Sequence, residues 1–348
     1  MKISSDFIGG NIIVEKQDGD TVYLLPDLRD STENWFYWAF CVSGAKGETV
    51  TFDFCDKNVI GYYGPAVSSD FKNWEWLGKT DERSRFAYTF AGNEPIYFAH
   101  NMPYLPEKFF RFCDENNLKP ETLCISEKGR EVPCLKFGSG EKNIILTSRH
   151  HACESTGTYV LQGVLTELIN EMPRDISVLC VPFVDYDGVV DGDQGKARAP
   201  HDHNRDYLPE PIYATTRAIK DFADKNGVFM AFDFHSPWHM YGRNDAVFIV
   251  HNDFNDREEV QAFSELFKKY SDADTLGYDG KDDIESGQEW NSMGDKPNFA
   301  AQMAKRGKMA FTLETAYFGR EDYIFCEEKA IHTGVAFAKA LKEYLKTR

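Results

Sequence analysis

The sequence predicts an α/β protein in which a mixed central sheet carries helices on both faces, preceded by an antiparallel β-sandwich. Two observations predict this architecture. The first third of the chain consists of short apolar segments separated by Gly, Asp, Asn and Ser clusters, which is typical of antiparallel strands. From about residue 126, apolar strand-like segments alternate with helical ones, which indicates a mostly parallel or mixed sheet. Because 348 residues exceed the usual size of one core, we expect two domains, 1–125 and 126–348.

The N-terminal segments are rich in aromatic and β-branched residues and are bounded by turn residues. We expect strands at 11–15, 21–25, 35–42, 49–54, 85–90 and 95–98, followed by one short helix at 107–116. This part of the sequence has no residue pattern that indicates catalysis.

The C-terminal part alternates between buried strands and helices. Strands are expected at 143–147, 176–182, 228–234 and 308–313, and helices at 156–171, 211–225, 256–270 and 327–346. The Gly- and Asp-rich stretch 186–198 is interpreted as a long loop. In open α/β sheets, sites form at the C-terminal ends of strands, so polar residues just after each strand are the candidates for chemistry.

The charge and the cysteines of the chain restrict its partners and its location. With a formal net charge of −17, it would be repelled by a nucleic acid or an anionic membrane, so neither is expected as a partner. The eight cysteines include no pair with CxxC spacing, and most sit in apolar runs, which predicts reduced core thiols. The first residues show no apolar signal core, and no apolar stretch is long enough to span a membrane. We therefore expect a cytoplasmic protein.

Three polar segments that follow predicted strands suggest a metal site. His151 and Glu154 form an HxxE pair just past one strand, and His235 ends another. Two imidazoles and one carboxylate are a ligand set of catalytic zinc sites, which leave one position open for water. Glu314, at the end of a third strand, could supply the base that such a water needs.

Other residues compete for a metal at this level of reasoning. His150 lies four residues before Glu154, and His239 lies four residues after His235. A calcium site is also conceivable in the Asp-rich loop, but no helix flanks that loop as in an EF-hand, so we do not favour it.

The segment 202–207 offers groups for binding a carboxylate. Arg205 has a planar fork of donors that suits a carboxylate, and Asn204 adds an amide donor beside it. Together they could hold a terminal carboxylate, which would let an enzyme recognise the end of a chain. The alternative is a solvated turn with a surface ion pair.

These segments, taken together, resemble the zinc carboxypeptidases, and most closely the cytosolic carboxypeptidase subfamily. The resemblance is carried, in this order, by HACE at 151–154, DYDGV at 185–189, DHNR at 202–205, DFH at 233–235 and FTLE at 311–314. The front half resembles the N-terminal β-sandwich of that subfamily, notably at WFYWAF 35–40 and IYFAH 96–100. The resemblance therefore covers nearly the whole chain and implies a zinc carboxypeptidase-like fold.

The resemblance implies a role for each matching residue. His151, Glu154 and His235 would bind one Zn²⁺ per chain, in preference to the competing histidines. Glu314 would be the general base that activates the zinc-bound water and then protonates the leaving amine. The implied function is that of a zinc-dependent metallocarboxypeptidase, a hydrolase that cleaves the C-terminal peptide bond of a peptide or protein.

The resemblance also implies the residues around the metal. Asn204 and Arg205 would hold the C-terminal carboxylate of the substrate. Asp202 matches the carboxylate that orients a zinc-bound imidazole from outside the ligand set.

One position departs from the family pattern at the cation that stabilises the oxyanion. Strict spacing from Asn204 places the family's arginine at Gly195, which has no side chain to do this. Arg198 or Lys196 must substitute with a shifted loop, and we assign the role to Arg198.

The substrate side of the site stays open. By distance from Glu314, the family's mobile tyrosine would fall near Trp290 or Ser292, and Tyr317 lies on the other side of Glu314. A substrate with an acidic C-terminal residue would require a basic pocket. A substrate with an apolar one would require an aromatic pocket, which Trp238 and Trp290 could line. The candidates for the basic pocket are Lys296, Lys305, Arg306 and Arg243.

Two other functions remain open. The chain could be a zinc amide hydrolase, or deacylase, that acts on a small N-acyl amino acid or a cell-wall peptide, because related deacylases share the HxxE pair and the third histidine. Those relatives usually lack the front sandwich, which favours a peptidase. A non-catalytic zinc-binding module is the third hypothesis, and the intact ligand set together with Glu314 argues against it. The sequence does not predict an oligomeric state.

Overall fold

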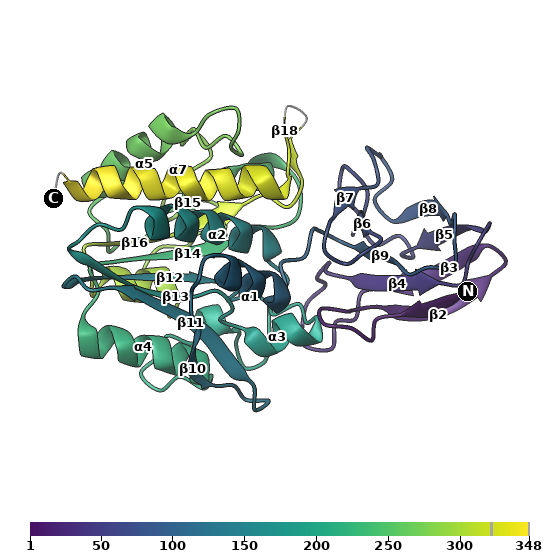
Figure 1. The fold of residues 1–348 in the computed structure, drawn as a ribbon, viewed down its shortest axis with the longest axis horizontal. Coiled ribbons are helices and arrows are strands. Elements are labelled where there is room, and N and C mark those ends of the chain that lie inside the picture. Colours follow the sequence, from purple (N-terminus) through teal and green to yellow (C-terminus); the bar gives the residue numbers. More distant parts are fainter. Residues whose placement is uncertain (321–322, 347–348) are drawn as a thin grey trace.

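The computed structural model describes residues 1–320 and 323–346, and its C-terminal part is built on a mixed seven-stranded sheet (Figure 1). The strand order is β10-β11-β13-β12-β14-β16-β15. Strands β12, β13, β14 and β16 run parallel, whereas β10, β11 and β15 pair antiparallel toward the two edges. The bounds are β10 Glu121–Ile125, β11 Glu131–Gly138, β12 Lys142–Ser148, β13 Ile176–Val181, β14 Met230–His235, β15 Val247–Val250 and β16 Met309–Thr315.

Helices cover both faces of this sheet, which confirms the predicted fold class (Figure 1). On one face, α1, α2, α5 and α7 share a core with Ile144 and Leu146 of β12. On the other face, α4 and α6 share a core with Ile145. The bounds are α1 Pro106–Glu115, α2 Ser155–Asn170, α3 Tyr186–Asp191, α4 Ala214–Asn226, α5 Arg257–Tyr270, α6 Phe299–Ala304 and α7 Glu327–Lys346.

Helix α2 lies unusually close to its neighbours because three of its contacts are made at glycines. A Cβ at Gly163 of α2 would lie 1.9 Å from the carbonyl oxygen of Ile331 in α7, and a Cβ at Gly334 of α7 would lie 1.9 Å from the carbonyl oxygen of Val160. At the other end, a Cβ at Gly157 would lie 2.7 Å from the backbone of Phe234 in β14. The backbones of α2, α7 and β14 are therefore in direct contact.

The N-terminal part consists of two sheets packed face to face. One has the order β1-β4-β9-β6-β7 and the other β2-β3-β5-β8. Their inner faces share an aromatic core that includes Phe40, Phe52, Phe86 and Phe98. All strand pairs are antiparallel except β3 with β5, which is parallel. The bounds are β1 Lys2–Ser4, β2 Ile13–Asp18, β3 Thr21–Leu25, β4 Ala39–Ser43, β5 Thr49–Asp53, β6 Ala66–Ser68, β7 Glu75–Trp76, β8 Arg85–Thr89 and β9 Ile96–Ala99.

The structure differs from the expected elements in a few places. The stretch 186–198 is not one long loop, because α3 forms at its start: the carboxylate of Asp185 accepts a hydrogen bond from the backbone N–H of Gly188, and Gly192 ends the helix with a left-handed φ of 76°. Strand β4 begins at Ala39 rather than at residue 35. The sequence did not predict helix α6 or the strands β1, β6, β7, β10, β11 and β15.

The division into domains at residue 125 stays a prediction. Strand β10 ends at Ile125 and already pairs within the seven-stranded sheet, and α1 shares the core of that sheet. None of the helices in the described part of the chain combines the length and the apolar character that a membrane crossing requires. Short elements complete the fold: 3-10 turns at His203–Arg205 and Gly242–Asp245, and a hairpin of β17 Gly319–Arg320 with β18 Tyr323–Ile324.

Candidate metal centre

The candidate residues gather at one edge of the seven-stranded sheet, where three neighbouring parallel strands end. In the register of these strands, Ser148 of β12 pairs with Phe234 of β14, and His235 of β14 pairs with Glu314 of β16. His151 follows β12 after a turn in which Arg149 has a left-handed φ of 59°. The carboxyl ends of parallel strands meet at one edge, so residues far apart in sequence converge here.

His151, Glu154 and His235 form one buried group. Nδ1 of His151 lies 2.8 Å from Oε1 of Glu154, and Nδ1 of His235 lies 2.7 Å from Oε2 of the same carboxylate. The three residues are no more than 2% exposed, and one ligand atom from each lies within 4.8 Å of the others. Two imidazole nitrogens and one carboxylate oxygen, converging from a loop and a strand end, fit a zinc ion with an open position.

The charges around this group keep Glu154 ionised. Burial opposes the charge of Glu154, but His151, His235 and Lys196 outweigh burial and hold the pKa of Glu154 well below its usual range. A metal ligand must be deprotonated, so Glu154 is in the form that a cation requires.

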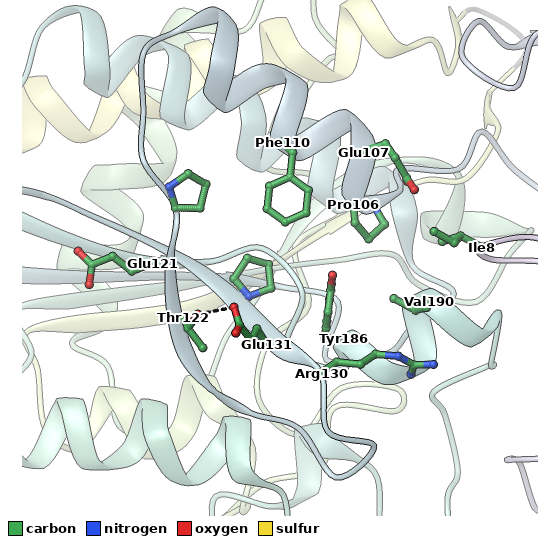
Figure 2. A pocket seen from close by; sticks show the side chains of 12 residues that line it. Ile8, Pro106, Glu107, Phe110, Glu121, Thr122, Arg130, Glu131, Tyr186 and Val190 are labelled. Atoms are coloured by element: carbon green, nitrogen blue, oxygen red, sulfur yellow. Dashed lines mark hydrogen bonds between the residues drawn. The ribbon is translucent and has the colours of Figure 1, made fainter.

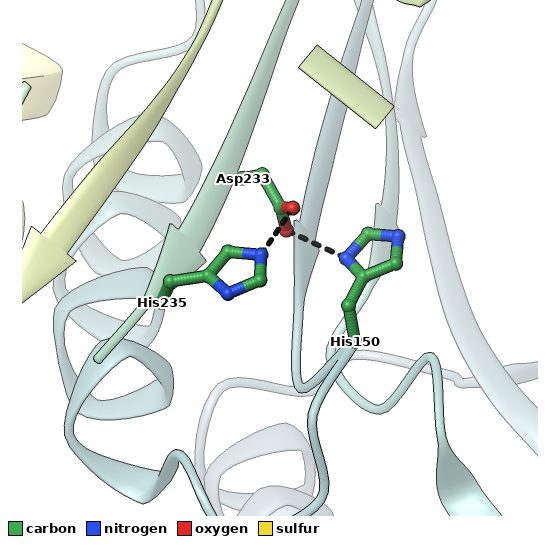
Figure 3. A group of neighbouring side chains, drawn as sticks. All are labelled: His150, Asp233 and His235. Atoms are coloured by element: carbon green, nitrogen blue, oxygen red, sulfur yellow. Dashed lines mark hydrogen bonds and ion pairs between the residues drawn. The ribbon is translucent and has the colours of Figure 1, made fainter. Parts of the chain in front are cut away.

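A second group of possible ligands shares His235 and is shown in Figure 3. Oδ1 of Asp233 lies 2.9 Å from Nδ1 of His150, and Oδ2 lies 2.5 Å from Nε2 of His235. The hydroxyl of Thr147 donates to Oδ1 of Asp233, and the hydroxyl of Tyr207 lies 2.8 Å from Nε2 of His150. His150 has both ring nitrogens engaged, one with Asp233 and one with the hydroxyl of Tyr207, and Asp233 also accepts from Thr147. This group therefore serves better as a support for His235 than as a metal site.

This support determines which nitrogen of His235 is available. Because Nε2 faces Asp233, Nδ1 is the nitrogen that faces Glu154. The other competing histidine, His239, lies elsewhere: its ring stacks on Phe36 with centroids 4.3 Å apart, and its Nδ1 lies 3.4 Å from Nε2 of His100.

Glu314 is a buried carboxyl with an unsatisfied oxygen. It is 7% exposed, and its Oε2 has no hydrogen-bond partner among the described residues. Burial is the main cause that raises the pKa of Glu314 to about 7; the charge of Glu154 raises it further, and His235 lowers it. A carboxyl with a pKa near neutrality is suited to taking up and returning a proton.

The DHNR segment lies against the same group. Oδ1 of Asp202 lies 3.6 Å from Nε2 of His151, and Nδ2 of Asn204 lies 3.5 Å from Nε2 of His235. Arg205 is exposed. The pKa of Lys296 is lowered, mainly by the burial of Lys296 and further by the charge of Arg205. The structure therefore brings together the predicted ligands and the predicted carboxylate-binding residues, with Lys296 as a further cation near Arg205.

Arg198 is not directed at this group. Its guanidinium is enclosed by three carboxylates, with contacts of 3.0 Å to Asp30, 2.8 Å to Asp185 and 3.1 Å to Asp193. Burial disfavours the charge of Arg198, but these carboxylates outweigh burial and raise its pKa. The assignment of Arg198 as the oxyanion cation does not fit this geometry, because its donors are already taken.

Lys196, the other candidate for this cation, lies against the ligand group. Its Nζ lies 3.2 Å from Nδ1 of His151 and 3.6 Å from Oε1 of Glu154. The ammonium also lies 5.5 Å from the ring centroid of Trp35, which comes from the N-terminal part. The sequence left both cations possible and favoured Arg198, because it does not reveal that Asp30, which lies 168 residues away along the chain, helps to enclose Arg198.

The other sequence candidates are distributed as follows. Tyr317 is buried with its hydroxyl 3.7 Å from Sγ of Cys153, and Trp290 is 54% exposed. The remaining candidates for a basic pocket have acidic partners: Arg243 with Glu289, Lys305 with Asp295 and Arg306 with Asp224. In the Asp-rich stretch, Asp187 and Asp191 are paired with Arg130, which leaves them poorly placed for calcium.

A separate pocket of about 520 Å³ lies between α1, β10 and α3 (Figure 2). Phe110, Tyr186 and Val190 line its apolar side, and Glu107 and Arg130 line its polar side. Its lining includes none of the candidate site residues.

A comparison of this sequence with those of known proteins finds relatives of two kinds. No protein-family model matches the chain. The chain is 28% identical over 260 residues to an uncharacterized protein from Zymomonas mobilis, which covers 68% of this chain and 67% of that protein. It is 29% identical over 194 residues to human cytosolic carboxypeptidase 2, which covers 47% of this chain. The match spans only 21% of the length of that carboxypeptidase.

Comparison with solved structures extends over the whole chain. A metallo-carboxypeptidase from Burkholderia cenocepacia has a TM-score of 0.82 at 20% identity, and the match covers 99% of both chains. A metallo-carboxypeptidase from Pseudomonas aeruginosa has a TM-score of 0.79 at 17% identity, again over 99% of both chains. The likeness therefore includes the N-terminal part and confirms the predicted fold.

Proposed function

We propose that this chain, a zinc carboxypeptidase-like protein by its sequence relatives and its fold, is a metallo-carboxypeptidase that hydrolyses the C-terminal peptide bond of a peptide or protein. The observation that carries the proposal is the buried group of His151, Glu154 and His235 with Glu314 on the neighbouring strand end. These residues offer three ligands for one zinc ion and a carboxyl beside them.

The residues around the metal have distinct tasks in this proposal. Zinc held by the three ligands would polarise the scissile carbonyl and lower the pKa of a water molecule. Glu314 takes a proton from the attacking water and later gives it to the nitrogen of the leaving amine. Its pKa of about 7 supports both transfers near neutral pH. Asp233 holds His235 in the orientation that directs it at the metal. Asp202, whose Oδ1 lies 3.6 Å from Nε2 of His151, is the carboxylate that would orient His151.

Asn204, Arg205 and Lys296 form the side of the site that binds the end of the substrate. Asn204 lies beside His235, and Arg205 and Lys296 add two positive charges in an acidic protein. A terminal carboxylate bound by the Arg205 fork would lie close to the metal ligands, so the bond cleaved would be the one next to the chain end.

Lys196 supplies the positive charge at the scissile carbonyl. Its ammonium lies next to two of the metal ligands, where negative charge develops on the carbonyl oxygen during hydrolysis. A lysine is a compact cation on a flexible stem, so it can shift outward when a metal and a substrate occupy the centre.

The test of the proposed function is a pair of measurements on the purified protein. We expect about one zinc per chain, since the ligand set is that of single-zinc sites. We also expect release of the C-terminal amino acid from peptides with a free terminus and only a slow background rate on amidated peptides. Zinc with no hydrolysis of any peptide, but with hydrolysis of an N-acyl amino acid, would favour the amide-hydrolase alternative. Zinc with no hydrolysis at all would favour a binding module.

We also propose a cytoplasmic location. All eight cysteines are free, and Cys113, Cys134, Cys153 and Cys180 are buried. Reduced thiols in a core are compatible with a reducing compartment, which supports the location expected from the sequence.

A further inference from the structure

The stretch that carries Lys196 is held from outside the C-terminal part, by the loop between β3 and β4. This loop, residues 26–38, makes hydrogen bonds to residues 193–195 and to Ala197. The side chain of Gln194 accepts a hydrogen bond from the backbone N–H of Tyr37 at 2.9 Å and donates to the carbonyl of Tyr37 at 2.8 Å. The side chain of Asn11 donates to the carbonyl of Gly192 at 2.7 Å.

Asp30 is the centre of these contacts. Its Oδ1 accepts from the backbone N–H of Gln194 at 2.9 Å, and its Oδ2 accepts from the backbone N–H of Gly195 at 2.8 Å. Oδ2 also accepts from Nε of Arg198 at 3.0 Å. One carboxylate therefore fixes both peptide groups that precede Lys196 and the arginine that follows it. Hydrogen bonds from N–H groups to an ionised carboxylate are the stronger kind.

Thr32 fixes the chain on the other side of Lys196. Its backbone N–H donates to the carbonyl of Ala197 at 3.0 Å, and its hydroxyl donates to the same carbonyl at 2.7 Å. Ala197 has a φ of 53°, in the left-handed region that an alanine rarely adopts. Such a conformation persists only where surrounding contacts hold it, and Thr32 supplies two of them.

Lys196 thus sits between two residues of left-handed backbone. Gly195 has a φ of 71°, and a Cβ there would lie 2.0 Å from the backbone nitrogen of Ala152, in the HACE segment. The turn is therefore pressed against the loop that carries His151 and Glu154. The direction in which the Lys196 side chain leaves the backbone follows from the conformations of Gly195 and Ala197, and these are set by Asp30 and Thr32.

We propose that Asp30 and Thr32 are positioning residues for Lys196, so that the N-terminal part of the chain completes the active site by fixing the turn 194–197. This inference rests on the proposed function, because it takes Lys196 to be the cation at the scissile carbonyl. Neither residue touches the metal ligands: they act through the backbone of Gln194, Gly195 and Ala197.

The first experiment is a kinetic comparison of variants of the full chain. Asp30→Asn places an amide donor against the N–H of Gly195 or Gln194, and Thr32→Val removes the hydroxyl. Each should lower kcat by about 10- to 100-fold, since a misplaced catalytic group costs up to that much. KM and the zinc dissociation constant should stay within about twofold of the parent values, because Asn204, Arg205 and the metal ligands are unchanged. Thr32→Ser should restore the parent kcat. Glu33→Gln is the matched control, since Glu33 is an exposed acid of the same loop.

A double-variant test separates positioning from general support of the fold. In a Lys196→Met background, Asp30→Asn and Thr32→Val should cause no further loss of kcat, because the group that they position is gone. A loss of kcat that is as large in the Lys196→Met background as in the parent, or a weaker zinc affinity, would overturn the inference.

The second experiment measures the reactivity of the Lys196 side chain and needs no substrate. In the metal-loaded protein, trace acetylation with acetic anhydride reports the reactivity of each lysine, and Lys281, 79% exposed, serves as the internal reference. Labelling of Lys196 relative to Lys281 should rise in Asp30→Asn and Thr32→Val and stay unchanged in Glu33→Gln. Equal labelling in all variants would overturn the inference. An absence of peptide hydrolysis in the parent would instead contradict the proposed function and leave this readout intact.

Discussion

His235 and Glu314 occupy paired positions on the adjacent parallel strands β14 and β16. The pairing places a metal-ligand candidate and an acid–base candidate side by side on a rigid sheet, without a flexible loop between them. Glu314 is buried, and its Oε2 has no hydrogen-bond partner in the part of the chain that the structure describes. The charge of His235 lowers the pKa of Glu314.

The first prediction is that Glu314→Gln keeps zinc and loses hydrolysis. Glutamine has nearly the same shape but cannot accept a proton, so kcat should fall by about a thousandfold. The measurements are zinc content by atomic spectroscopy and the rate of amino-acid release. A variant that retains the parent rate would show that another group is the base.

The second prediction concerns pH. A base must be ionised, and burial raises the pKa of Glu314 to about 7. As the pH falls below about 7, Glu314 becomes protonated, so kcat/KM should fall by about tenfold per pH unit. A pH–rate profile between pH 5 and 9, in which zinc content is checked at each end, tests this. An acidic limb centred near 4.5, the ordinary value for a glutamate, would contradict it.

The third prediction is that zinc affinity depends on Asp233, although Asp233 does not bind the metal. His151→Ala and His235→Ala should lose zinc, whereas Asp233→Asn should weaken zinc affinity by about 10- to 100-fold, since Asp233 holds Nε2 of His235. Competition with a chromogenic chelator measures the dissociation constants. His332→Ala, at an exposed position of α7, is the control and should bind zinc as the parent does.

The fourth prediction concerns the end of the substrate. Arg205→Ala should raise KM for peptides with a free C-terminus by about 10- to 100-fold, because a charge-assisted bond of about 1.5–3 kcal/mol is lost. The slow background rate on the matching amidated peptides should not change. Equal losses on both kinds of peptide would show that Arg205 does not bind the terminal carboxylate.

The fifth prediction separates the two cations of the loop. Arg198→Met leaves Asp30, Asp185 and Asp193 without their shared partner, so it should lower the free energy of unfolding by about 3–5 kcal/mol. Lys196→Met should leave stability nearly unchanged and lower kcat by about a hundredfold. Denaturant unfolding and steady-state kinetics on the same preparations compare the two. Arg198→Met with full stability but no activity would favour the assignment made from sequence.

Much of the architecture could be predicted because its signals are local. The strands that carry the site, β12, β14 and β16, are apolar runs followed at once by polar residues, and this pattern marks the edge of a sheet at which ligands converge. The edge strands were harder to predict from the sequence. β11 contains a proline and two charged residues, and β15 has only four residues, so neither shows a strong strand pattern.

The surroundings of the site could not be predicted, because they depend on contacts between distant segments. Nothing in the local sequence of Arg198 shows that Asp30 and Asp185 will enclose it. Helix α3 was missed for a similar reason. Its six residues include a glycine and two aspartates, and it forms with the help of the Asp185 cap and the left-handed Gly192.

The close contacts of α2 have a consequence for how the protein can change over time. The helix starts immediately after Glu154, and its glycines leave no spare room against β14 or α7. Gly334 lies on α7, which supplies no candidate ligand. A methyl group added there would displace α2, and Glu154 would move with the helix that it precedes. The candidate metal centre is thus sensitive to a position in α7, and a substitution there that changes no ligand would still be expected to weaken zinc binding.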